Sequence, residues 1–188
     1  MVRWEPDAKG RLARAALELY SERGFEQTTV AEIAERAGLT ERTFFRHFAD
    51  KREVLFAGSH ELQDVMAAAL AGAPDDASPV DAVGAALGAA AEVLQDRREY
   101  ARRRQAAIAA NTDLQERELI KMASLAAALA EALRGRGVRE PAASLTAEAG
   151  IAVFRVAFER WITATGKRTL AWYIRESLDE LKAVTAGR

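Results

Sequence analysis

The chain of 188 residues contains no cysteine, only two histidines and only four prolines. Without cysteine it can form no disulfide bond and offers no thiolate to a substrate or a metal ion. No apolar run reaches the roughly 18 residues of a membrane span, because charged residues interrupt the alanine-rich stretches. The polar N-terminus, which contains Pro6, does not resemble a signal peptide. We therefore expect a soluble cytoplasmic protein without a membrane partner.

Residue patterns that support catalysis are also missing. Neither His47 nor His60 follows a glutamate at the spacing of a di-iron bundle, and we find no glycine-rich phosphate loop or serine nucleophile elbow. We expect no enzyme, no metal site and no cofactor. Basic and acidic residues nearly balance, 27 against 28, with a net charge of −1. Any binding to nucleic acid must therefore depend on where the basic residues lie.

The apolar residues recur at helical rather than alternating spacing, in alanine-rich segments. The expected fold is all-α with about nine helices: a small three-helix domain over residues 1–50 and a larger helical bundle over residues 51–188. Asp50 and Glu53 have the spacing of a helix start, which predicts one helix from Asp50 to about Leu70. The domain boundary would then lie inside a helix, which favours mechanical coupling between the two parts.

Two helix starts and one helix end follow one another closely in the N-terminal part. Thr29 and Glu32 have the spacing of a capping box, and Gly38 supplies the left-handed turn that ends this first helix. Thr40 caps a second helix over residues 41–47. Two short helices joined by a tight glycine turn predict a helix-turn-helix, whose second helix fits the major groove of DNA.

The second of these helices has an inward and an outward side. Phe44 and Phe48 are spaced to pack against the first helix, so the polar positions face outward. Arginine binds guanine bidentately, and threonine contacts thymine methyl groups or phosphates. The predicted DNA-binding residues are Arg42, Thr43 and Arg46 for base edges or adjacent phosphates, Thr40, His47 and Lys51 for the backbone, and Thr29 and Phe45. The alternative is a two-helix corner of any helical protein, with Arg42 and Arg46 as solvated surface.

A longer series of residues resembles the N-terminal domain of TetR-family transcriptional regulators over about residues 8–56. The matching residues are Gly24, Phe25, Thr28, Thr29, Val30, Ile33, Ala34, Ala37, Gly38, the run 43–48, Lys51 and the run 54–56. The resemblance implies a homodimer on a palindromic operator and a larger domain that binds a small effector. Phe45 departs from the family pattern, which usually has a tyrosine whose hydroxyl contacts a phosphate, and phenylalanine cannot make this contact.

The larger part carries apolar residues that suit an adaptable ligand cavity. The candidate pocket residues are Leu62, Met66, Leu87, Leu94, Tyr100, Arg103, Met122, Leu125, Phe154 and Phe158. Each apolar one also fits an ordinary core position, and we expect Leu119 to face inward as well. The five arginines between Arg97 and Arg104 could hold phosphates, pair with acids or form a solvated face. The second half is similar to regulators with an acyl-CoA-like ligand domain of the mycofactocin-regulator type, so an acyl-CoA is a candidate effector.

The last two predicted helices are apolar on more than one side, which indicates two neighbours. In the family the equivalent pair forms a four-helix dimer interface, and the resemblance implies the same here. The predicted interface residues are Val153, Ala157, Trp161, Trp172, Tyr173 and Leu178. A dimer would place two recognition helices one turn of DNA apart, roughly 34–36 Å.

The expected function is thus a ligand-responsive transcriptional regulator, a repressor by family default. It would bind palindromic double-stranded DNA as a homodimer and be released or altered by a small-molecule effector. The alternative is a helical protein-interaction adaptor without specific DNA binding, for which the outward side chains of residues 40–46 would be irrelevant.

Overall fold

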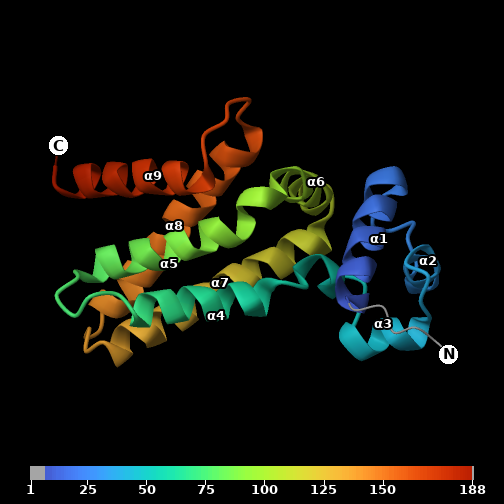
Figure 1. Cartoon of the computed structure of the whole chain (residues 1–188), viewed down its shortest axis with the longest axis horizontal. Coiled ribbons are helices and arrows are strands. Elements are labelled where there is room, and N and C mark those ends of the chain that lie inside the picture. The colour runs from blue at the N-terminus through green and yellow to red at the C-terminus, as the bar shows by residue number, and fades with distance from the viewer. Residues whose placement is uncertain (1–6, 188) are drawn as a thin grey trace. The chain divides into compact units, whose positions relative to one another are not determined.

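The computed structural model describes residues 7–187. These residues form nine α-helices and two short 3₁₀ helices, and no strand occurs among them (Figure 1). The predicted all-α fold is therefore confirmed. Within the same residues, no helix is long and apolar enough to cross a membrane. The chain divides into two compact units.

The first compact unit consists of Met1–Ser59 together with Arg103–Leu119. Its elements are α1 (Ala8–Arg23), α2 (Val30–Arg36), α3 (Glu41–His47) and the 3₁₀ helix η1 (Glu53–Phe56). Helix α1 contacts α2, α3 and η1, and α2 contacts α3. Leu12, Ile33 and Phe44 are fully buried between these elements. The apolar face of each short helix is therefore covered inside one small core.

The second compact unit consists of His60–Arg102 and Ile120–Arg188. It is built from α4 (Ser59–Ala71), α5 (Pro79–Leu94), the 3₁₀ helix η2 (Gln95–Arg97), α6 (Arg98–Ala109), α7 (Thr112–Gly135), α8 (Ala142–Thr163) and α9 (Leu170–Thr185). Helices α5, α8 and α9 contact one another, as Figure 1 shows. One core cluster collects side chains from α4 to α9. Helices α6 and α7 each begin in one unit and end in the other.

The helix starts and stops follow the local signals in the sequence. Thr29 and Glu32 form a complete capping box on α2, and Gly38 has a φ of 64°, in the left-handed region that favours glycine. Thr40 caps α3, and Ser78 caps α5. These capping predictions are confirmed. Each cap satisfies amide groups that have no partner inside the helix.

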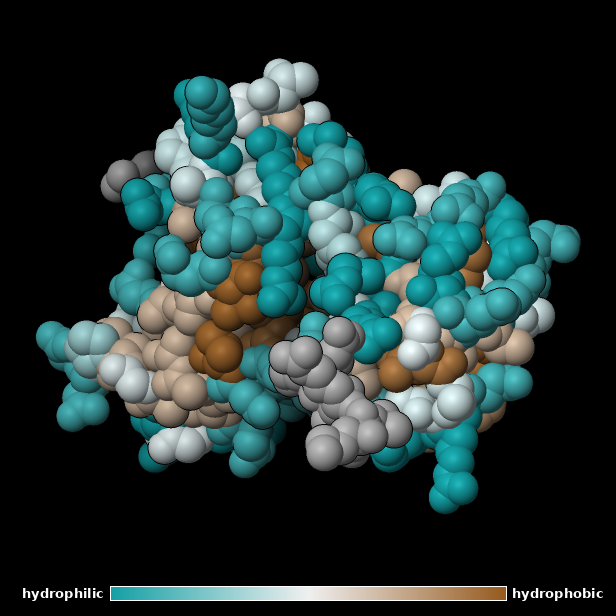
Figure 2. Space-filling model, turned by 45° about the vertical axis from the view of Figure 1, so that its right-hand side comes forward, coloured by the Kyte–Doolittle hydropathy of each residue, from teal (hydrophilic) through white to brown (hydrophobic). Residues whose placement is uncertain are grey.

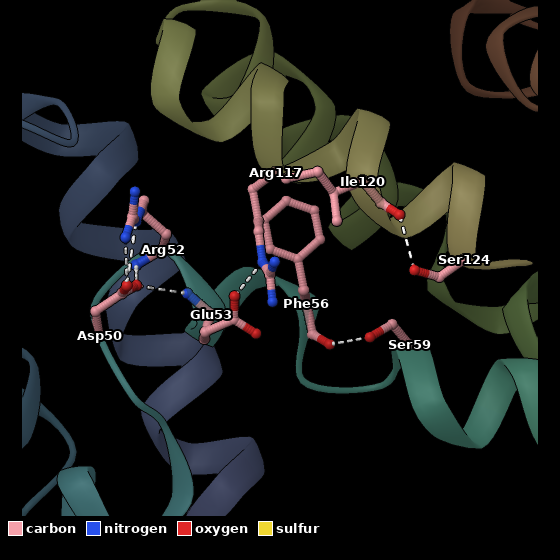
Figure 3. A network of polar contacts seen from close by, with 8 residues as sticks. All are labelled: Asp50, Arg52, Glu53, Phe56, Ser59, Arg117, Ile120 and Ser124. Carbon is pink, nitrogen blue, oxygen red and sulfur yellow. Dashed lines mark hydrogen bonds and ion pairs between the residues drawn. The ribbon is translucent and has the colours of Figure 1, made fainter.

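The prediction of one continuous helix from Asp50 to Leu70 is wrong. The Asp50 carboxylate accepts from the amides of Arg52 and Glu53, at 2.8 and 3.3 Å, and shapes a turn that leads into η1. The Ser59 hydroxyl then donates to the Phe56 carbonyl at 2.8 Å, where α4 begins (Figure 3). By compactness the first unit extends to Ser59, and residues 103–119 belong to it.

The expected inward position of Leu119 is also wrong, since its side chain is 60 % exposed. The inward stripe of α7 runs through Leu114, Glu118, Met122 and Leu125, which recur at intervals of three or four residues. Leu119 lies one position beyond this stripe and is therefore turned about a quarter of the way around the helix. The covered positions include a glutamate, which an apolar periodicity cannot indicate.

Candidate nucleic-acid interface

Helix α3 is held in place by short-range hydrogen bonds at its start and a buried ring at its centre. The Leu39 amide donates to the Ala34 carbonyl at 2.8 Å across the glycine turn. The Thr40 hydroxyl accepts from the Thr43 amide at 3.2 Å. Phe44 is fully buried and contacts Phe48 with 5.4 Å between ring centroids. These contacts fix which side of α3 faces outward.

The outward side of α3 carries most of the predicted DNA-binding residues. Arg42, Arg46 and His47 are exposed, and Thr43 is half-buried beside the capping hydroxyl of Thr40. Their side chains therefore lie on one short helix and can approach one surface together. Hydrogen-bond donors of this kind on a helix of groove-fitting size suit base edges and phosphates.

Phe45 is the one large apolar residue on this outward side, with 56 % of its surface exposed. Its ring meets that of the buried Phe44 edge-on, at 5.5 Å between centroids. This contact orients an apolar group among polar neighbours. In the major groove, the matching apolar group is the thymine methyl.

Thr29 stands apart from α3 and already serves as a cap. Its hydroxyl accepts from the Glu32 amide at 3.3 Å and donates to the Glu32 carboxylate at 2.8 Å. Hydrogen bonds from the Thr29 amide and hydroxyl lower the pKa of Glu32, and an ion pair with Arg23 acts in the same direction. The structure thus places Thr29 at the start of α2, with a structural role in addition to the predicted contact.

Lys51 also has internal partners. Its ammonium group donates to the carbonyls of Phe25 and Thr28, at 2.9 and 3.1 Å, and lies 4.2 Å from the centre of the Phe25 ring. The Tyr20 hydroxyl donates to the Lys51 carbonyl at 2.6 Å, and burial raises the pKa of Tyr20. Lys51 therefore ties the loop between α1 and α2 to the residues after α3. Sequence reasoning missed this role because both partners are backbone carbonyls.

Residues 103–119 hold η1, the segment that follows α3, through a partly buried polar cluster. Arg117 forms an ion pair with Glu53 (Figure 3). Arg104 donates to the Leu55 carbonyl at 2.8 Å, pairs with Glu118 at 3.1 Å and lies over the Phe56 ring at 4.8 Å. We call Glu53, Arg104, Arg117 and Glu118 the η1 brace. Its side chains are 18–30 % exposed, so solvent screens these pairs less than ordinary surface pairs.

The remaining arginines of the basic run have different surroundings. Arg98 donates to the carbonyls of Ala164 and Gly166 after α8, and Arg102 donates to the Ile162 carbonyl at 3.0 Å. Arg97 and Arg103 are exposed. Three of the five arginines therefore bind backbone carbonyls, a use that the charge pattern alone does not reveal.

The apolar residues of the predicted ligand pocket come together in the second unit. Met66, Leu87, Leu125 and Phe154 belong to its core cluster, and Leu62, Leu94, Met122 and Phe158 are partly buried against it. Tyr100 is half-buried in α6. Arg103 is exposed and belongs to the segment that joins the first unit.

The predicted dimer residues lie mostly in the core of the second unit. Val153, Ala157, Trp161, Tyr173 and Leu178 are buried there, and Ala157 and Trp161 have no exposed surface. Trp172 is half-buried, with Arg168 over its ring at 3.8 Å. The exposed large apolar residues of the same two helices are Leu145, Val156 and Val184. Figure 2 shows that hydrophilic side chains cover much of the visible face and that apolar groups are exposed only in part of it.

Two family models match the chain. Residues 12–57 match that of bacterial regulatory proteins of the tetR family, and residues 77–186 match that of the MftR C-terminal domain. The chain is 39 % identical over 88 residues to the HTH-type transcriptional regulator TcmR of Streptomyces glaucescens. That match covers 47 % of this chain and 39 % of the relative, so the chain spans about two fifths of the length of that protein.

Solved structures with a similar fold include three proteins called FadR. The protein from Thermus thermophilus, in complex with lauroyl-CoA, is 26 % identical with a TM-score of 0.54 and 93 % of both chains covered. The Bacillus subtilis protein, in complex with stearoyl-CoA, is 19 % identical with a TM-score of 0.60, covering 92 % of this chain and 96 % of that one. The Bacillus halodurans protein is 18 % identical with a TM-score of 0.60, covering 95 % and 96 %.

Proposed function

Because the chain belongs to the TetR family of bacterial transcriptional regulators, we propose that it is a ligand-responsive repressor that binds a palindromic operator as a homodimer. Residues 1–50 bind DNA, and residues 51–188 bind the effector and form the dimer. The outward side of α3 carries this proposal, since Arg42, Thr43 and Arg46 lie there around the exposed Phe45. The cytoplasm, where operator DNA is accessible, is the proposed location.

Titration against a library of genomic DNA fragments at two salt concentrations tests DNA binding. We expect tight, sequence-selective binding by two protomers per site, and affinity should fall as salt rises because phosphate contacts release counterions. Weak binding that is equal on all fragments, before and after refolding to remove bound ligand, would support the adaptor alternative.

An apolar stripe on α8 supports the dimer. Leu145, Ala149, Ala152 and Val156 follow helical spacing on one side, and Leu145 and Val156 are more than half exposed. A second copy of the chain would cover this stripe. Sedimentation should give a dimer for the wild type and a monomer for Val156→Glu. Leu119→Glu is the matched control, because it places the same charge on another exposed apolar position.

A fatty acyl-CoA is the proposed effector. Two of the similar structures hold lauroyl-CoA and stearoyl-CoA, and the second unit has a large apolar core that includes Met66 and Phe154. Calorimetry should detect binding of lauroyl-CoA and much weaker binding of CoA alone, because only the former buries an acyl chain. An absence of both heat and thermal shift with lauroyl-CoA would contradict the proposal.

The η1 brace offers a route from the effector to DNA. Helices α6 and α7 run through both units, and residues 103–119 hold η1 directly after α3. The protein would have two conformations that differ in the position of residues 103–119. A ligand among the helices of the second unit changes DNA affinity by binding one of these conformations more tightly than the other. The measurable consequence is that effector and operator weaken each other's binding by the same factor.

A further inference from the structure

The C-terminal end of α8 carries a row of aromatic side chains. Phe154 and Phe158 stack with 5.8 Å between ring centroids, and Phe158 and Trp161 follow at 5.9 Å. Trp161 is fully buried, whereas Phe158 is half-buried. The row therefore runs from a partly accessible ring to an enclosed indole.

Two hydrogen-bond donors at the enclosed end of this row lack an acceptor. The Trp161 Nε1–H and the Arg98 Nε–H are both buried, and neither has a hydrogen-bond partner among the described residues. The Arg98 guanidinium carbon lies 5.8 Å from the centre of the Trp161 ring. Buried N–H groups without a partner are rare in folded proteins, and each one needs an explanation. Here two of them lie close together where Arg98 meets Trp161, a place that we call the corner. This arrangement indicates a position for a hydrogen-bond acceptor.

Nearby acceptors are already in use. The carbonyls of Ala164 and Gly166 accept from the terminal nitrogens of Arg98, and the Gln95 side-chain oxygen accepts from the Leu170 amide at 3.0 Å. These bonds fix the guanidinium and leave its Nε–H directed elsewhere. These three oxygens thus already accept from other donors, whereas the two N–H groups have no acceptor among the described residues.

The charge at this corner favours a neutral acceptor. Arg98 is positive, but its fork faces carbonyls at the C-terminal end of α8, where the helix dipole is negative. The two partly cancel, so an ionised carboxylate would gain little to offset the loss of its hydration. A carbonyl oxygen requires less desolvation and can accept from buried N–H groups.

We propose that Trp161 and Arg98 bind the carbonyl oxygen of an apolar ligand, whose hydrophobic body lies along Phe154 and Phe158. The inference rests on the proposed effector function. It narrows the effector to compounds that contain a carbonyl group: ketones, esters, amides and thioesters. Trp161 is therefore a recognition residue of the effector site rather than a contact of the dimer surface.

A matched pair of probes tests the inference: propiophenone, which has a carbonyl, and propylbenzene, which has a methylene in its place. The variant Trp4→Phe/Trp172→Phe leaves Trp161 as the single tryptophan, so its indole N–H gives one peak in a ¹H–¹⁵N spectrum. We expect propiophenone to move this proton downfield and to bind about five- to tenfold more tightly than propylbenzene, the value of one buried hydrogen bond.

Trp161→Phe keeps an aromatic ring and removes the donor, so it should reduce that preference to about twofold or less. Arg98→Lys, which removes the Nε–H, should lower it as well. Equal affinity for the two probes, binding of neither, or an indole proton that does not move would overturn the inference, and the donors would then bind solvent only. Operator binding by the same samples tests the proposed function separately, because it involves the first unit.

Discussion

The outward side of α3 exposes the charged residues Arg42 and Arg46, whereas the outward side of α8 exposes the apolar residues Leu145 and Val156. On α3, the predicted residues Arg42 and Arg46 are exposed where two caps and one glycine turn place them. On α8, the predicted Ala157 and Trp161 are fully buried, while Leu145 and Val156 are exposed. A helix of 7 residues whose one buried residue is Phe44 has a single apolar side. A helix of 22 residues that is apolar on several sides can bury any one of these sides, so its pattern does not show which side stays exposed.

The largest effect should come from Trp161→Ala, which tests the buried side of α8. Removal of this fully buried ring should lower the free energy of unfolding by about 3–5 kcal/mol, because it leaves a cavity. Trp172→Ala on α9 is the control, since that ring is half-buried and should cost less than half as much. Urea unfolding measures both, and equal costs would mean that Trp161 is not a core residue.

On α3, the double variant Arg42→Ala/Arg46→Ala should lower operator affinity about 100-fold or more. Each arginine that contacts a base contributes roughly 1–3 kcal/mol. The urea midpoint should stay unchanged, because both side chains are exposed. Arg139→Ala removes an exposed arginine of the second unit and should leave DNA affinity as it is. Undiminished affinity in the double variant would show that α3 does not read DNA.

The η1 brace tests a third situation, in which arginines support the segment after α3 from within the fold. Arg104→Met should cost about 2 kcal/mol of stability, because it leaves Glu118 without its charged partner and the Leu55 carbonyl without its donor. Arg103→Met is the matched control at the preceding, exposed position, and it should change the stability little. If the two variants unfold at the same urea concentration, the brace does not stabilise the protein.

Phe45 should contribute a smaller, position-specific effect. Replacement of one operator thymine by uracil removes a methyl group, which is worth about 0.8 kcal/mol or roughly fourfold in affinity when buried. We expect this loss at one half-site position for the wild type and no loss for Phe45→Ala. Uniform affinity across all uracil-substituted operators would contradict a contact between Phe45 and thymine.

The smallest effect concerns pH. A side-chain hydrogen bond from Arg52 and the amides of Arg52 and Glu53 lower the pKa of Asp50 below its ordinary 3.8. A carboxylate with a lowered pKa in the folded state stabilises the protein above the unfolded pKa, and this contribution disappears as the pH falls below about 3.8. Asp50→Asn should therefore lose stability near pH 7 and show a shallower decline in acid. Parallel pH profiles of urea stability would contradict this assignment.

Features that depend on residues close together in the sequence were predictable, and features that depend on distant residues were not. The helix starts at Thr29, Thr40 and Ser78 were predictable because each depends on residues within four positions. The break at Ser59 was not, since a run of three buried residues, Val54 to Phe56, fits either a helix or a short turn that is covered on several sides. Residues 103–119 form part of the structure that packs on this run. They are distant in sequence, so the residues near Ser59 do not indicate this packing.

The sequence by itself determined the all-α class, the helix-turn-helix and the outward residues of α3. These follow from caps, glycine geometry and helical periodicity, which act over a few residues. Only the tertiary structure decided that Arg104 supports η1, that Lys51 ties a loop and that Trp161 lies inside the core with an unused donor. Their partners are distant in sequence and often backbone carbonyls, which every residue carries. A periodic pattern indicates that a side chain is covered, but packing selects what covers it.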